Sequence, residues 1–177
     1  MEKNTVRPLA LSLTVLGILG RLMPHPWNFT PVGSVSLFSG ARMRGWQAFL
    51  LPLVLMAVTD PLLGGYSVAT PFVYAAFLVN VWIGRRLQST ENVGRIGAAC
   101  LVCSTQFFVI TNFGMWLSTA MYPHTAAGLA ACYTAALPFF GYTVAGDLAF
   151  AGMLFGLHAW LSRKVYTPER VAVPQAA

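Results

Sequence analysis

Long apolar stretches separated by short clusters of basic residues run along the whole chain. Seven stretches can be marked, at about 6–23, 30–41, 46–63, 68–87, 96–117, 125–140 and 144–161. A helix needs about 20 predominantly apolar residues to cross a bilayer, and most of these stretches approach that length. The pattern therefore predicts an all-α integral membrane protein.

The basic residues indicate how many stretches cross, because Lys and Arg accumulate in short cytoplasmic loops. Ten of the eleven Lys and Arg residues share one side if both termini and the clusters at 42–44, 85–95 and 163–170 are cytoplasmic. This placement requires an even number of crossings between clusters. Six transmembrane helices satisfy it, at about 6–23, 30–41, 46–63, 68–87, 96–117 and 144–161. The alternative has seven helices and places the carboxyl-terminal cations outside.

Two short stretches need separate explanations in the six-helix interpretation. The 125–140 stretch is rich in small residues and contains Pro138, which predicts a non-spanning short or re-entrant helix on the outer side. Irregular backbone at membrane depth must be covered by protein or line a cavity, so this segment implies a pocket. The 30–41 stretch carries glycines and serines that permit close packing, and we expect it to be buried among its neighbours.

Composition agrees with this class. Hydrophobic residues make up 56% of the 177 residues and charged residues only 9%, far below the usual quarter. The net charge of +6 is concentrated at the ends of apolar stretches, which favours contact with membrane lipid and indicates no nucleic-acid partner. Arg21 and the segment 24–26 stand where a signal peptide would need small residues, so we expect the first stretch to be retained. The prediction is one domain, residues 1–177, in the inner (cytoplasmic) membrane.

Three charged residues, Arg21, Asp60 and Asp147, lie within or against the apolar stretches. A charge at the centre of a membrane helix costs about 2.5–3.5 kcal/mol on insertion scales, so each marks a functional-site hypothesis. The predicted topology brings these and other polar or aromatic groups to the outer side as candidate substrate-binding residues: Arg21, His25, Trp27, Asn28, Asp60, Tyr66, Asn112, Trp116, His124 and Asp147. Aromatic and apolar concavities with a few placed polar groups are typical of small-molecule sites.

Structural roles remain open for the same residues. Trp and Tyr also form belts at membrane interfaces. The alternative for the three charged residues is a purely structural charge network. The alternative for Asn112 is a hydrogen bond to a neighbouring helix, and for His124 it is a helix cap.

No catalytic or metal site is predicted. Cys100 and Cys103 lie on one helical face of an apolar stretch, where cysteine commonly packs as a small hydrophobe. The chain lacks a Gly-rich phosphate loop with its lysine, so it cannot hydrolyse ATP by that route. We therefore expect no enzyme activity and no cofactor.

Several short motifs resemble a known family. They are Asn28-Phe29-Thr30-Pro31-Val32-Gly33, Thr59-Asp60-Pro61-Leu62-Leu63-Gly64, Thr111-Asn112-Phe113-Gly114, Ala136-Leu137-Pro138-Phe139-Phe140 and Gly146-Asp147. Over about residues 6–163 the chain resembles the substrate-binding S components of energy-coupling-factor (ECF) vitamin transporters, and more closely a bacterial family of transport proteins of that type.

This resemblance implies a six-helix membrane protein that captures a small water-soluble vitamin or related micronutrient from outside. It also implies a transmembrane coupling subunit with two ATPases as partner. Ala10, Thr14 and Gly17 fall at i, i+4 and i+7 and correspond to a small-residue docking face on the first helix, with Thr14 departing from the usual alanine. Plain helix packing is the alternative for this face.

The leading hypothesis is thus a transport subunit that binds a small-molecule substrate. A structural or assembly protein is the alternative, and a membrane enzyme comes third.

Overall fold

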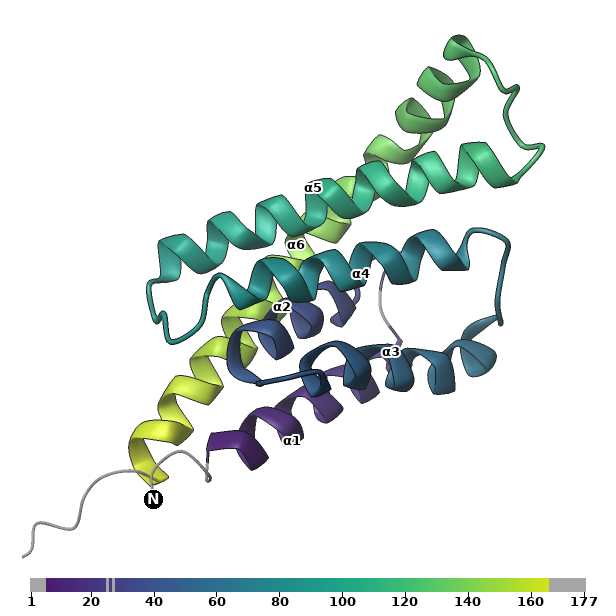
Figure 1. Cartoon of the computed structure of the whole chain (residues 1–177). Coiled ribbons are helices and arrows are strands. Elements are labelled where there is room, and N and C mark those ends of the chain that lie inside the picture. The colour runs from purple at the N-terminus through teal and green to yellow at the C-terminus, as the bar shows by residue number, and fades with distance from the viewer. Residues whose placement is uncertain (1–5, 25, 27, 166–177) are drawn as a thin grey trace, which may run out of the picture.

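The computed structural model of the chain describes residues 6–24, 26 and 28–165, and within them the secondary structure is entirely helical (Figure 1). The α-helices are α1 (Val6–Leu19), α2 (Val32–Arg42), α3 (Gln47–Thr59), α4 (Thr70–Arg85), α5 (Val93–Ser118) and α6 (Ala126–Val165). Two short 3₁₀ helices, η1 (Gly20–Leu22) and η2 (Asp60–Leu63), continue α1 and α3. The predicted all-α class and the six helices are confirmed for this part of the chain.

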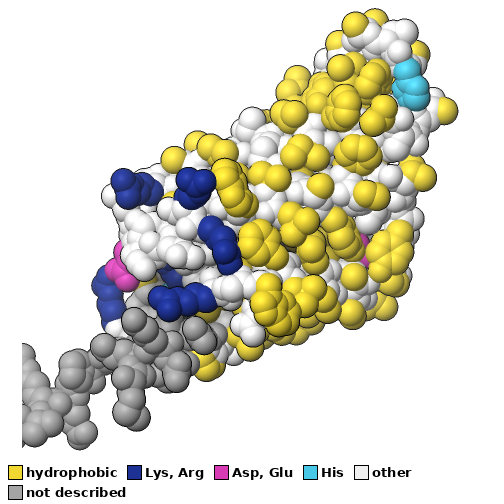
Figure 2. All heavy atoms as spheres, viewed as in Figure 1, with side chains coloured by type: hydrophobic (Ala, Val, Ile, Leu, Met, Phe, Trp, Pro, Cys, Tyr) yellow, Lys and Arg dark blue, Asp and Glu magenta, His cyan; other side chains and the backbone are white. Residues whose placement is uncertain are grey.

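Successive helices run in opposite directions, and the bundle has one basic end, defined by Arg42, Arg44, Arg85, Arg86, Arg95, Arg163 and Lys164. The loops after α2 and α4 meet there: Arg85 donates to the Gly45 carbonyl, and Arg42 donates to the Thr90 carbonyl at 2.5 Å. Figure 2 shows the Lys and Arg side chains gathered at this end. The predicted grouping of these seven cations is confirmed, and the beginning of α1 and the end of α6 lie with them (Figure 1).

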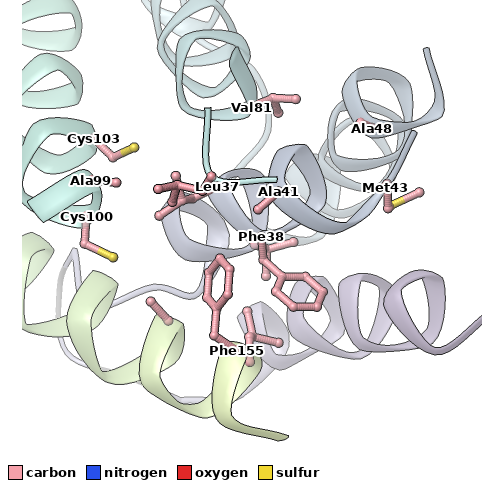
Figure 3. Close-up of a cluster of buried hydrophobic side chains, with 14 of the residues drawn as sticks. Leu37, Phe38, Ala41, Met43, Ala48, Val81, Ala99, Cys100, Cys103 and Phe155 are labelled. Atoms are coloured by element: carbon pink, nitrogen blue, oxygen red, sulfur yellow. The ribbon is translucent and has the colours of Figure 1, made fainter. Parts of the chain in front are cut away.

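The short helix α2 lies at the centre of the bundle. Every residue from Val32 to Ala41 is buried, as predicted for this stretch. Figure 3 shows Leu37 and Phe38 of α2 surrounded by side chains of α4, α5 and α6. Glycines allow the closest approach: a Cβ added to Gly40 would lie 2.0 Å from the Val81 carbonyl oxygen. Backbone contact of this kind is typical of small residues between membrane helices.

The helix α6 corrects one prediction. It is a single helix of 40 residues that passes through Pro138, so 125–140 is not a separate short or re-entrant segment. Proline removes one backbone hydrogen bond of a helix, and long helices tolerate this where neighbouring groups satisfy the freed carbonyl. At ~1.5 Å per residue α6 is about 60 Å long. Its first half packs against α5, where the Phe108 ring meets Phe140 at 5.0 Å, and projects from the bundle (Figure 1).

The surface between the basic end and the tip of α6 is rich in apolar side chains (Figure 2). Large ones are widely exposed, among them Leu16 (63%), Val58 (64%) and Val109 (48%). By length and composition, α5 and residues 126–164 of α6 can cross a membrane, while α1 with η1 and α3 with η2 form shorter apolar helices.

The small-residue face of α1 points into the bundle. Ala10 and Thr14 are fully buried, and the Thr14 hydroxyl donates to the Ala10 carbonyl. A Cβ added to Gly17 would lie 2.5 Å from Val35 Cγ2 in α2. These three residues therefore pack within the chain, which agrees with the helix-packing alternative and leaves no exposed surface of Ala10 or Thr14 for a docking partner.

Candidate functional site: a polar cavity opposite the basic end

A cavity of about 240 Å³ lies between the helices toward the end opposite the cations. It is large enough to hold several water molecules or a small organic solute. Five α-helices (α2 to α6), both 3₁₀ helices and the loops before α2 and α4 contribute lining residues: Arg21, Asn28, Thr30, Val32, Gly33, Met56, Asp60, Gly65, Thr70, Val73, Tyr74, Phe77, Asn80, Phe107, Thr143 and Asp147. The cavity thus combines an aromatic and aliphatic wall with ionisable and hydrogen-bonding groups.

Arg21 and Asp60 form an ion pair at one side of the cavity. The Arg21 Nη1 lies 2.6 Å from Asp60 Oδ1, with the two side chains 18% and 9% exposed. The Tyr74 hydroxyl donates to the other carboxylate oxygen, Oδ2. Arg21 also donates to the Thr59 hydroxyl at 2.9 Å. The pair joins the ends of α1 and α3, as the predicted neutralisation of Arg21 by Asp60 requires.

Asp147 lies at a different wall and is 4% exposed. Ser104 Oγ is 2.6 Å from its Oδ2, and Ser34 Oγ is 2.7 Å from its backbone carbonyl and 3.4 Å from Oδ1. Within the described ranges, no Lys, Arg or His nitrogen lies within 4.0 Å of this carboxylate. Arg21 therefore pairs with Asp60 and not with Asp147, and the three charged residues do not form one network.

Asn80 lies at the inner part of the cavity and is fully buried. Its Oδ1 accepts a hydrogen bond of 2.6 Å from Gln106 Nε2 on α5. Its Nδ2 has no hydrogen-bond partner in the part of the chain that the structure describes. Buried donors are nearly always satisfied, so this nitrogen at the cavity wall is an exception that a bound molecule would resolve after a small side-chain shift.

The segment before α2 is shaped to reach the cavity. Asn28 adopts a left-handed conformation with φ of 61°, which asparagine tolerates better than most residues. Gly146 lets α6 approach the same segment, because a Cβ added there would lie 3.2 Å from Phe29 Cα. The next residue of α6, Asp147, then faces the cavity beside Gly33.

Four predicted site residues, Arg21, Asn28, Asp60 and Asp147, line this cavity, and four others do not. Tyr66 is 58% exposed and donates to the Ala57 carbonyl.

The other three residues lie on the projecting part of the molecule. Asn112 donates to the Phe108 carbonyl of its own helix, Trp116 donates to the Pro123 carbonyl, and the His124 ring packs on Trp116 at 5.4 Å. Convergence of these residues on one pocket with Arg21 is therefore a wrong prediction. His25 and Trp27 lie outside the described residues.

Sequence reasoning missed several residues of the site. Tyr74, Asn80 and Thr143 line the cavity, and Ser34 and Ser104 contact Asp147. Asn80 carried a usable signal, because it is a lone amide inside the apolar stretch 68–87. Nothing in the sequence distinguishes Ser34 and Ser104 from the other serines of the chain.

The polar and charged side chains that line the cavity favour binding of a small molecule through hydrogen bonds and charge. Among the residues that the structure describes, no group of three or more His, Cys, Asp or Glu side chains could hold a metal ion. Cys100 and Cys103 are buried in the hydrophobic core, as the packing interpretation predicts (Figure 3).

No curated protein and no solved structure matches this chain. A family described as a family of unknown function (DUF6580) matches residues 2–173, and the chain belongs to that family.

Proposed function

We propose that this protein is an integral membrane protein that binds a small water-soluble solute in the polar cavity, as the substrate-binding subunit of an uptake system. The single observation that carries the proposal is the cavity itself. It collects Arg21, Asp60, Asp147 and an Asn80 amide nitrogen that has no partner among the described residues, inside a bundle whose face in Figure 2 is rich in apolar side chains away from the basic end. Ionisable groups at such positions commonly belong to substrate pathways.

Six membrane crossings are part of the proposal. The six antiparallel helices, the exposed apolar surface and the cations gathered at one end support it. Because Lys and Arg favour the cytoplasmic side, the basic end and both termini would be cytoplasmic in the inner membrane, and the cavity would open toward the outside. The solute would then be captured from the outer medium.

The transport part of the proposal rests on the resemblance to ECF S components. Such a subunit would need a transmembrane coupling protein and two ATPases to drive release of a vitamin or related micronutrient inward. Since Ala10, Thr14 and Gly17 are packed within the bundle, another surface would have to meet that partner.

A purely structural role is the second candidate, and one observation favours it. The cavity groups also connect elements: Arg21 with Asp60 joins η1 to η2, and the contacts of Asp147 join α6 to α2 and α5. In that case the polar groups would hold the helices in register and bind nothing else.

Ligand capture distinguishes the two candidates. We expect small molecules to copurify with gently solubilised protein and to be identified by mass spectrometry. A bound solute should stabilise the fold by about 2.7 kcal/mol at a hundred times its dissociation constant, measurable as a thermal shift. Asn80→Ala should abolish the shift while the protein stays folded, and Asn112→Ala, whose amide bonds within its own helix, should keep it. Absence of any ligand in a broad screen of vitamins and their precursors would favour the structural role.

A further inference from the structure

We infer that the cavity selects a small organic cation, with Asp147 as the counter-ion of the bound ligand. The inference rests on the proposed function, because it names the substrate class of the same cavity. It follows from three properties of the lining: its charge balance, its aromatic wall and its unused hydrogen-bond donor.

Asp147 is the one charged-type side chain of the cavity lining that has no oppositely charged partner among the described residues. Arg21 and Asp60 compensate each other at 2.6 Å, and the Tyr74 hydroxyl is also committed to Asp60. Among the described residues, the Asp147 carboxylate has only hydroxyl partners, Ser34 and Ser104, and the residue is 4% exposed. A buried carboxylate without a cation is strongly unfavourable, and a positively charged ligand would supply the partner that the described chain does not.

The wall of the cavity fits an organic cation better than a metal ion. Tyr74, Phe77 and Phe107 line it, and the rings of Phe77 and Phe107 meet at 4.9 Å between centroids. Aromatic faces attract cations and also pack against planar rings. Hard metal ions instead need several oxygen ligands, and no group of three acidic, His or Cys side chains occurs among the described residues.

Asn80 adds a second requirement. Its Nδ2 donor is fully buried at the cavity wall and lacks a partner in the described part of the chain, whereas its Oδ1 is already occupied by Gln106, so a small side-chain shift would present the donor to a ligand. A ligand that fills the cavity well should therefore carry a hydrogen-bond acceptor in addition to its positive group. The volume of about 240 Å³ limits it to a small molecule with one ring or a comparable branched group.

Charge-matched compounds test the inference on the full-length solubilised protein. The probes are sets of small ring compounds of equal size that differ in charge, such as benzylammonium, benzyl alcohol and benzoate, measured by thermal shift and titration calorimetry. We expect the cationic member of a set to bind about tenfold or more tightly than its neutral and anionic counterparts. Asp147→Asn should weaken the cation about tenfold or more and change the neutral compound less than about threefold. Glu91→Gln, which removes an exposed carboxylate at the basic end, is the matched control and should change neither.

Phe107→Leu keeps the carboxylate and provides a second variant if Asp147→Asn does not fold. It should weaken the cation more than the neutral compound, because both compounds lose ring packing but only the cation also loses the electrostatic attraction to the ring face. Tighter binding of neutral or anionic members, or equal cation binding in Asp147→Asn, would overturn the cationic class and leave the proposed function standing. Binding of no compound of any charge, with no copurified small molecule, would overturn both.

Discussion

Gly33 of α2 and Asp147 of α6 are fitted to each other, since a Cβ added to Gly33 would lie 2.2 Å from Asp147 Oδ1. No side chain can be accommodated at position 33 while the carboxylate keeps its place between Ser34 and Ser104. The two motifs Pro31-Val32-Gly33 and Gly146-Asp147, far apart in sequence, thus form one contact that sets the position of the carboxylate in the cavity.

Gly33→Ala should destabilise the protein and displace Asp147. Overpacking typically costs about 1–3 kcal/mol, only partly offset by the higher helix propensity of alanine. The apparent melting temperature of the solubilised variant should fall. The double variant Gly33→Ala/Asp147→Ala should recover part of the loss, because the second change removes the clashing atoms.

Gly152→Ala is the matched control for this experiment. It lies in α6 with nothing within 4 Å of the added Cβ, so its melting temperature should stay unchanged or rise slightly. Equal effects of the two alanine substitutions would contradict the proposed contact at Gly33.

Gly84→Ala should be more damaging than Gly33→Ala. Its Cβ would lie 2.1 Å from the Leu37 carbonyl oxygen, and backbone cannot rotate away as a side chain can. Separation of α2 from α4 should cost about 3 kcal/mol or more and should be visible as loss of monodisperse protein in size-exclusion chromatography. Gly97→Ala, at an open position of α5, should behave like the wild type.

Arg21→Ala and Asp60→Ala should each destabilise the fold, because each leaves a poorly solvated charge without its partner. Breaking a buried pair costs about 3–5 kcal/mol, and the partial exposure of this pair places the expected loss nearer 2 kcal/mol. The double variant should lose less than the sum of the two single variants in thermal unfolding.

Strict additivity of Arg21→Ala and Asp60→Ala would show that the pair is not energetically coupled. Glu91→Gln breaks the exposed Arg163–Glu91 pair, whose side chains are 75% and 57% exposed, and gives the scale of a weak surface interaction. Its effect should stay below about 1 kcal/mol.

Cysteine labelling tests the proposed membrane orientation. On a background without Cys100, Cys103 and Cys132, Met121→Cys should react with an impermeant maleimide on intact cells, because position 121 is exposed at the loop between α5 and α6. Ser89→Cys, in the loop between α4 and α5, should react only after the membrane is opened. Labelling of both positions from the same side would refute six crossings with a cytoplasmic basic end.

The helices were predictable because apolar length and the spacing of cations are local properties. The stretches 68–87 and 96–117 agree with α4 and α5 to within a few residues. The continuity of α6 was not predictable from Pro138, since the tolerance of a helix for proline depends on its surroundings. The stretches 125–140 and 144–161 were predicted as two separate segments, and the structure joins them in α6.

The site was only half predictable for a different reason. Charges in apolar stretches are conspicuous, so Arg21, Asp60 and Asp147 were identified and lie on the cavity. Which aromatic residues join them depends on how far α5 and α6 extend, and this length carries Trp116 and His124 away from the cavity. Whether Asn80 joins the site depends on which side of α4 faces the cavity. The sequence of α4 is apolar on nearly all sides, so it does not predict that side.

The enclosed position of α2 has a consequence for how the protein is made. With 11 residues α2 is only about 16 Å long, about half the ~30 Å thickness of a bilayer core, and its buried serines suit protein contact rather than lipid. Its surroundings include α4, α5 and α6, which the ribosome synthesises afterwards. When α2 leaves the ribosome, the helices that enclose it in the folded protein have therefore not yet been synthesised. In the proposed membrane arrangement α2 would wait at the insertion machinery, or near the membrane surface, until the carboxyl-terminal half of the chain arrives to enclose it.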